Sequence, residues 1–88
     1  MIKIELKIVN ELGIHARPAG MLANTASRFS CDIKLLKDGM EVNAKSIMGI
    51  MTLAAGCGSL IEVTAKGKDE AAAAKALADL FASKFDEE

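Results

Sequence analysis

The sequence predicts an α+β fold, an open-faced β-sandwich in which a four-stranded, largely antiparallel sheet is covered on one face by helices. Four short segments alternate apolar and polar residues, as strands with one buried and one wet face do. Between and after them lie segments with the apolar spacing of a helix. These segments follow one another as β-α-β-β-α-β-α. Strands with a single apolar face need helices on one side only, which predicts the one-sided arrangement.

The predicted strands are short and separated by turn residues. Residues 2–8 place isoleucine and leucine at every second position, with charged side chains between them. Residues 31–35 and 40–44 show the same alternation, and Asp38-Gly39 between them is a strong signal for a two-residue hairpin turn. The alternation at residues 61–65 predicts the fourth strand.

The first and last predicted helices are amphipathic. The first begins at Ala16, where the apolar spacing changes from two residues to three or four. The last follows Gly67, with Asp69 or a neighbour as its N-terminal cap. Its apolar stripe comprises Ala73, Ala76, Leu77, Leu80 and Phe81, continued at Lys84 and Phe85.

A short helix is predicted between the third and fourth strands. It begins after Ser46, covers residues 47–53, and is ended by Gly56 or Gly58. This segment is apolar nearly all round, whereas a surface helix can bury only one stripe. Some of its side chains are therefore expected to stay outside the core.

Those exposed side chains predict a surface for partner proteins. If Ile50 and Leu53 point inward, the remaining apolar residues of the short helix lie partly outside. Exposed methionines are uncommon, and a flexible methionine surface suits binding to several partners. Filling gaps in the core is the alternative, above all for Met51. The predicted partner surface comprises Met21, Asn24, Ile47, Met48 and Met51.

The composition argues against several classes of protein. The 88 residues suffice for one domain, residues 1–88, and a hydrophobic fraction of 51% can supply its core. The formal net charge of −1 argues against a nucleic-acid partner and against attraction to anionic membranes. No segment has the pattern of a signal peptide or the length of a membrane span. A cytoplasmic location without membrane insertion is expected.

The two cysteines, Cys31 and Cys57, stand far apart in the sequence. Neither belongs to a Cys-x-x-Cys pair, so the sequence does not favour a metal or redox site, and a secreted disulfide framework would normally contain more cysteines. Both are expected to be reduced and to behave as small apolar residues. We expect neither a metal nor a cofactor.

His15 is the candidate for chemistry. It is the single histidine and lies between a turn and a helix. A histidine there is more often a surface or capping residue, but a helix N-terminus also offers unpaired N–H groups and partial positive charge to an anion. Imidazole in that position can accept a phosphoryl group and release it again. Arg17, otherwise an ordinary solvated side chain, can screen the phosphate charge.

Ser46 allows two compatible interpretations. Serine is among the best N-cap residues, and a helix begins directly after it. The same position offers an exposed hydroxyl beside Lys45, where an added phosphate would lie favourably at the helix dipole. A cap can also be a site of modification.

Two segments resemble the signatures of a known family. The segment GIHARPA at residues 13–19 resembles the phosphorylation-site signature of HPr, the histidine-containing phosphocarrier family of the bacterial phosphoenolpyruvate-dependent phosphotransferase system. The segment KSIMGIM at residues 45–51 is similar to that family's second signature, around a regulatory serine. The resemblance covers the whole chain, strand order included. Ala54 and Ala55 depart from it, because the family commonly has a glycine there.

The resemblance implies a specific function. Enzyme I, charged from phosphoenolpyruvate, would phosphorylate His15 on Nδ1, Arg17 would assist the phosphoryl group, and EIIA domains would receive it. An ATP-dependent HPr kinase/phosphorylase would phosphorylate Ser46 for regulation, with a transcriptional regulator as a further partner. The chain would then be a carrier, or co-substrate, rather than an enzyme, and is expected to be a monomer.

Other functions fit the sequence less well. A role in nitrogen or carbon signalling stays open, although purely regulatory relatives lack the acceptor histidine that this chain has. An acylphosphatase-like hydrolase needs an arginine in a glycine-rich phosphate loop, and a metal carrier needs a Cys-x-x-Cys loop; the sequence contains neither. A nucleic-acid-binding protein needs basic excess or exposed aromatic residues. The three phenylalanines, Phe29, Phe81 and Phe85, are interpreted as core residues.

Overall fold

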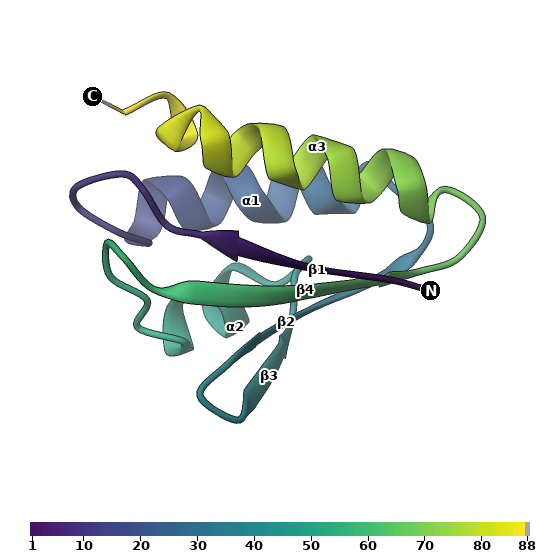
Figure 1. Cartoon of the computed structure of the whole chain (residues 1–88), viewed down its shortest axis with the longest axis horizontal. Helices are drawn as coiled ribbons and strands as arrows, with labels where there is room; N and C mark the ends of the chain where they lie inside the picture. The colour runs from purple at the N-terminus through teal and green to yellow at the C-terminus, as the bar shows by residue number, and fades with distance from the viewer. Residues whose placement is uncertain (88) are drawn as a thin grey trace.

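The computed structural model describes residues 1–87, and its elements follow the predicted order (Figure 1). The strands are β1 (Ile2–Lys7), β2 (Asp32–Lys37), β3 (Met40–Asn43) and β4 (Leu60–Lys66). The helices are α1 (Ala16–Ser27), α2 (Ile47–Thr52) and α3 (Glu70–Ala82), and a short turn, η1 (Lys84–Asp86), follows α3.

The strands form one sheet in the order β1-β4-β2-β3, and every neighbouring pair is antiparallel. Helices α1 and α3 lie side by side over one face of this sheet, while α2 packs against α1 and β3 (Figure 1). The open-faced sandwich predicted from the alternation of apolar residues is therefore confirmed. Within residues 1–87, no helix has the length and apolar character needed to cross a membrane.

The core lies between the sheet and the helices and is mostly aliphatic. Each strand contributes the side chains on its apolar face, and each helix contributes one stripe. Phe29, predicted to be a core residue, is only partly buried and packs against the rim of the cluster. The largest fully buried side chains are Phe85, Ile8, Leu22, Ile33, Leu35, Ile50, Ile61, Leu77 and Val63.

The hairpin between β2 and β3 turns where the sequence predicts. Asp38 and Gly39 adopt φ angles of 50° and 81°, the pair of positive values that a type I′ turn requires. This turn matches the right-handed twist of the two strands that it joins.

Asp69 precedes α3, as predicted, but its side chain does not cap that helix. Its carboxylate instead accepts the backbone N–H groups of Ser30 at 2.8 Å and Cys31 at 3.0 Å. The hydrogen bond from the Ser30 backbone is the main reason that the pKa of Asp69 lies below its usual range, although partial burial acts against this shift. Asp69 thus joins the start of α3 to the segment that leads into β2.

The two cysteines have different environments. Cys31 is buried, as predicted for a small apolar residue, and burial is the main cause that raises the pKa of its thiol. Cys57 is exposed in the loop after α2, so the prediction that it behaves as an apolar residue is wrong. Both are free thiols.

Helix α2 does not end at a glycine, and that prediction was wrong. Leu53 is its C-cap, and Ala54 follows with a φ of 50°, in the left-handed region. This conformation costs a residue with a Cβ atom about 1 kcal/mol or more. Because Leu53 and Ala55 on either side are both buried, the core fixes the chain direction and imposes the left-handed turn on Ala54.

Replacing Ala54 by glycine removes the Cβ atom from this left-handed position. We expect Ala54→Gly to raise the free energy of unfolding by up to about 1 kcal/mol, after allowance for the larger entropy of glycine in the unfolded chain. The matched control is Ala55→Gly, because Ala55 is buried and has no positive φ. In that variant, the free energy of unfolding should fall by about 1 kcal/mol. Urea unfolding followed by circular dichroism measures both, and a destabilised Ala54→Gly would contradict the strain.

Candidate functional site

A close contact between two loops positions His15. Gly13 has a φ of 71°, and a Cβ atom there would lie only 2.8 Å from both the carbonyl oxygen of Ala55 and the Cα of Gly56. The N–H of Ile14 donates to the same Ala55 carbonyl at 2.9 Å. The loop after α2 therefore holds the loop before α1, and only glycine fits at the point of contact.

His15 is the N-cap residue of α1. Its backbone is extended, with φ −103° and ψ −167°, and its carbonyl accepts the N–H of Ala19 at 3.0 Å. The side chain of His15 does not cap the helix, and the first turn of α1 contains no acidic residue. The positive end of the helix dipole is therefore not neutralised from within the helix, and it favours an anion beside His15.

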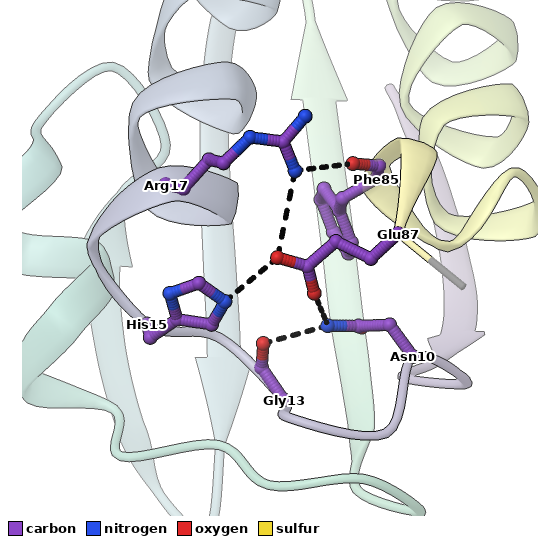
Figure 2. A network of polar contacts seen from close by, with 6 residues as sticks. All are labelled: Asn10, Gly13, His15, Arg17, Phe85 and Glu87. Carbon is purple, nitrogen blue, oxygen red and sulfur yellow. Dashed lines mark hydrogen bonds and ion pairs between the residues drawn. The ribbon is translucent and has the colours of Figure 1, made fainter.

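The imidazole ring of His15 contacts a carboxylate from the far end of the chain. Its Nε2 lies 2.8 Å from Oε2 of Glu87 (Figure 2). Within residues 1–87, its Nδ1 has no hydrogen-bond partner, and 41% of the side chain is exposed. One nitrogen of the ring is thus held by the protein, while the other is available to a reactant.

Arg17 lies on the first turn of α1 and reaches toward the same carboxylate. Its Nη1 donates to the carbonyl of Phe85 at 3.3 Å and lies 3.5 Å from Oε2 of Glu87. More than half of the side chain is exposed. The structure thus brings together His15 and Arg17, the two predicted residues of the phosphoryl site, through a third residue.

That third residue, Glu87, was not predicted from the sequence. Its other oxygen, Oε1, accepts a hydrogen bond from Nδ2 of Asn10 at 3.0 Å, and only 14% of its side chain is exposed. Partial burial alone would raise the pKa of Glu87. The hydrogen bonds from Asn10 and His15, together with the charges of His15 and Arg17, outweigh it and hold the pKa below its usual range.

Asn10 connects this network to the loop that carries His15. The residue is fully buried, and its Nδ2 also donates to the carbonyl of Gly13 at 2.7 Å. In the sequence, Asn10 is a residue type common in turns, and Glu87 lies in an acidic run, which is typical of a solvated surface. No local pattern identifies either residue, because Asn10 and Glu87 come together only when the chain folds.

Ser46 is the N-cap of α2, as predicted, and its Oγ accepts the N–H of Gly49 at 3.0 Å. The residue is half-buried rather than fully exposed. The Nζ of the neighbouring Lys45 donates to the carbonyl of Phe29 at 2.7 Å, beyond the end of α1. Within residues 1–87, no hydrogen bond joins Ser46 to the network around His15.

The predicted partner surface is largely exposed. On α2, Ile50 faces the core, whereas Ile47 and Met51 are exposed and Met48 is 75% exposed. Asn24 on α1 is also exposed.

Two residues differ from that prediction. Met21 is only partly exposed and packs against the core, so it contributes less surface than predicted. Leu12 is a large exposed apolar residue three positions before His15, and it was not predicted as part of this surface. The alternation of strand β1 ends before Leu12, so no periodic pattern separates an exposed from a buried leucine there.

Comparisons with known proteins identify the family of this chain. The family described as "PTS HPr component phosphorylation site" matches residues 2–83. Phosphocarrier protein HPr of Treponema pallidum is 49% identical over 88 residues, which is the whole of both chains.

Solved structures give the same result. A crystal structure of HPr from Thermoanaerobacter tengcongensis is 50% identical, covers 100% of this chain and 99% of its own, and superposes with a TM-score of 0.96. A second structure of HPr from that organism, solved as a dimer, has a TM-score of 0.78 at 49% identity and covers 97% of this chain and 98% of its own. The sequence match, the fold and the histidine at the start of α1 all identify the same family. The chain belongs to the HPr family of phosphocarrier proteins.

Proposed function

We propose that His15 accepts a phosphoryl group from phosphorylated Enzyme I on Nδ1 and donates it to EIIA domains. The observation that carries this proposal is the environment of the two ring nitrogens of His15, at the start of α1. Its Nε2 is engaged by Glu87, whereas Nδ1 has no partner within residues 1–87 and the side chain is well exposed. The chain acts as a carrier in this relay, with no turnover of its own.

The transfer is an exchange at phosphorus. The lone pair of Nδ1 attacks the phosphorus atom, a P–N bond forms, and the bond between phosphorus and the donor's leaving atom breaks, so that this electron pair stays with the donor. Onward transfer reverses the exchange, and the P–N electron pair returns to Nδ1. Imidazole suits both directions because it is a good nucleophile and a good leaving group.

Two groups would stabilise the phosphoryl oxygens. The first N–H groups of α1 have no partner earlier in the helix, and the helix dipole favours negative charge at this end. Within residues 1–87, the guanidinium of Arg17 uses only Nη1, for Phe85 and Glu87, so its other N–H groups remain as donors for the phosphoryl group. Arg17 therefore assists the transfer without leaving its position on α1.

Ser46 is proposed as a regulatory site for an ATP-dependent HPr kinase/phosphorylase. A phosphate on its Oγ would lie at the start of α2, beside the exposed Ile47 and Met48. The Nζ of Lys45 already donates one hydrogen bond to the carbonyl of Phe29. Phosphorylation of Ser46 would therefore place additional negative charge next to the partner surface.

The surface formed by Met21, Asn24, Ile47, Met48 and Met51 is proposed to dock Enzyme I, EIIA domains and a transcriptional regulator in turn. Its flexible apolar side chains can repack against different partners. The whole chain, residues 1–88, would act as a single HPr-like domain in the cytoplasm. We propose that the chain is a monomer. Because a relative was solved as a dimer, the oligomeric state of this chain should be measured.

Replacing His15 by alanine tests the acceptor. We expect His15→Ala to lose phosphoryl acceptance completely, because no other histidine is present, while the fold is retained. Incubation with phosphoenolpyruvate and Enzyme I, followed by intact mass measurement, reads the transfer. Wild-type protein should carry one acid-labile phosphate. A His15→Ala variant that is still labelled by Enzyme I would overturn the assignment.

The variant Ser46→Asp tests the effect of charge at the start of α2. We expect it to lower the rate of phosphoryl transfer from Enzyme I about fivefold at low salt, which corresponds to about 1 kcal/mol of charge repulsion. Ser46→Asn is the matched control, because asparagine is an equally good N-cap without charge. Equal rates for both variants at low and moderate salt would count against the electrostatic account.

The variant Met48→Asp tests the docking surface. We expect it to raise the KM for Enzyme I about tenfold, as for an important interface residue, while stability changes by less than about 0.5 kcal/mol. Met40→Asp makes the same change at an exposed methionine on β3 and should leave the KM unaltered. If Met48→Asp instead unfolds the domain, then Met48 belongs to the core.

A further inference from the structure

The contact between His15 and Glu87 restricts the ring to one tautomer. An ionised carboxylate can only accept hydrogen bonds, so the nitrogen that faces it must carry the proton. At 2.8 Å from Oε2 of Glu87, that nitrogen is Nε2. In the neutral ring the lone pair then lies on Nδ1, the nitrogen that faces away from the carboxylate (Figure 2).

Asn10 orients the carboxylate that selects this tautomer. Its Nδ2 donates to both the Gly13 carbonyl and Oε1 of Glu87, whereas its buried Oδ1 has no partner within residues 1–87. Turning the amide over would direct Oδ1 at two acceptors, which is worse than leaving one acceptor unpaired. The amide is therefore fixed, and it holds Oε1 so that Oε2 points at the imidazole ring.

A strained turn brings Glu87 to the site. Lys84, Phe85 and Asp86 have φ angles of 58°, 54° and 58°, and none of them is a glycine. Each left-handed residue costs about 1–2 kcal/mol, and such conformations persist where the surroundings impose them, often at functional sites. Phe85 supplies part of the compensation, because it is fully buried and its ring centroid lies 5.0 Å from that of Phe81.

We propose that Glu87 is a positioning residue for phosphoryl transfer, which fixes the reactive tautomer of His15 and then stabilises the charged ring. This inference rests on the function proposed above. The carboxylate of Glu87 accepts the Nε2–H of the free ring, so that Nδ1 presents its lone pair to phosphorus. When the P–N bond forms, the ring becomes an imidazolium, and the proton stays on Nε2 beside the carboxylate. When the phosphoryl group leaves, its electron pair returns to Nδ1 and the proton has not moved.

The same principle operates where a carboxylate holds a catalytic histidine in its reactive tautomer. Here the carboxylate lies on the Nε2 side of the ring, and the phosphoryl group would enter on the Nδ1 side. Glu87 can therefore stabilise the positive ring without touching the phosphoryl oxygens. In metal sites, loss of the carboxylate that holds a ligating histidine typically lowers activity about 10–100-fold, and we expect an effect near the lower end of that range here.

The experiment compares Glu87→Ala with Asp86→Asn. Asp86 is exposed in the same strained turn and makes no side-chain contact with the site within residues 1–87, so Asp86→Asn removes one negative charge without removing a hydrogen bond to His15. Long-range proton–nitrogen NMR of labelled, unphosphorylated protein at about pH 8.5, above the ordinary range of imidazole, reports the tautomer directly. Kinetics of phosphorylation by Enzyme I report kcat and KM separately.

We expect wild type and Asp86→Asn to hold the Nε2–H tautomer and Glu87→Ala to show a mixture of both. With Glu87→Ala as its substrate, the kcat of Enzyme I should fall about tenfold while the KM stays unchanged. With Asp86→Asn, both constants should match those for the wild type. The variant Glu87→Gln keeps an acceptor oxygen without the charge, so its kcat should lie between those of wild type and Glu87→Ala.

Two results would overturn the positioning role. One is a Glu87→Ala variant that keeps the Nε2–H tautomer, and the other is a loss of kcat no larger than that of Asp86→Asn. A purely structural role would lower the melting temperature and leave both readouts unchanged. If wild-type protein takes no phosphate from Enzyme I, the proposed function fails, but the NMR comparison needs no partner and still decides whether Glu87 selects the tautomer.

Discussion

The contact of Gly13 with the backbone of Ala55 and Gly56 is the constraint on which the arrangement of the site depends. A side chain at residue 13 would collide with a carbonyl oxygen and a Cα, so the chain can pass there only as glycine. This contact, with the hydrogen bond from Ile14 to Ala55, ties the start of α1 to the loop that follows α2. The histidine at the helix N-terminus and the apolar surface of α2 thereby become parts of one rigid unit.

The site combines two charge requirements that oppose each other. The incoming phosphoryl group needs positive surroundings, which the start of α1 and Arg17 provide. The imidazolium that forms needs a negative neighbour, which Glu87 provides. The five-membered ring separates the two, because its nitrogens point in different directions. Arg17 lies within reach of Glu87 and limits the repulsion between that carboxylate and the phosphoryl oxygens.

The sequence predicted those features that depend on neighbours along the chain. Alternation identified the strands, Asp38-Gly39 identified the hairpin, and Ser46 was recognised as a cap because its partner is only three residues away. The inward orientation of Ile50, which was the condition for an exposed partner surface on the short helix, agrees with its burial. Glu87 and Asn10 lay beyond such reasoning, because they meet across 77 residues of sequence. The left-handed Ala54 could not be predicted either, since its conformation is imposed by the burial of its neighbours.

The contact between His15 and Glu87 spans 72 residues of the chain, and this separation bears on biosynthesis. During translation the histidine leaves the ribosome long before the glutamate has been made, because domains emerge from the N-terminus. The pairing of β1 with β4 and the docking of α3 must come first, since they bring the turn at Phe85 to the start of α1. The imidazole therefore reaches its final state only after Glu87 has been made and has left the ribosome, and until then the growing chain would display the histidine without its carboxylate.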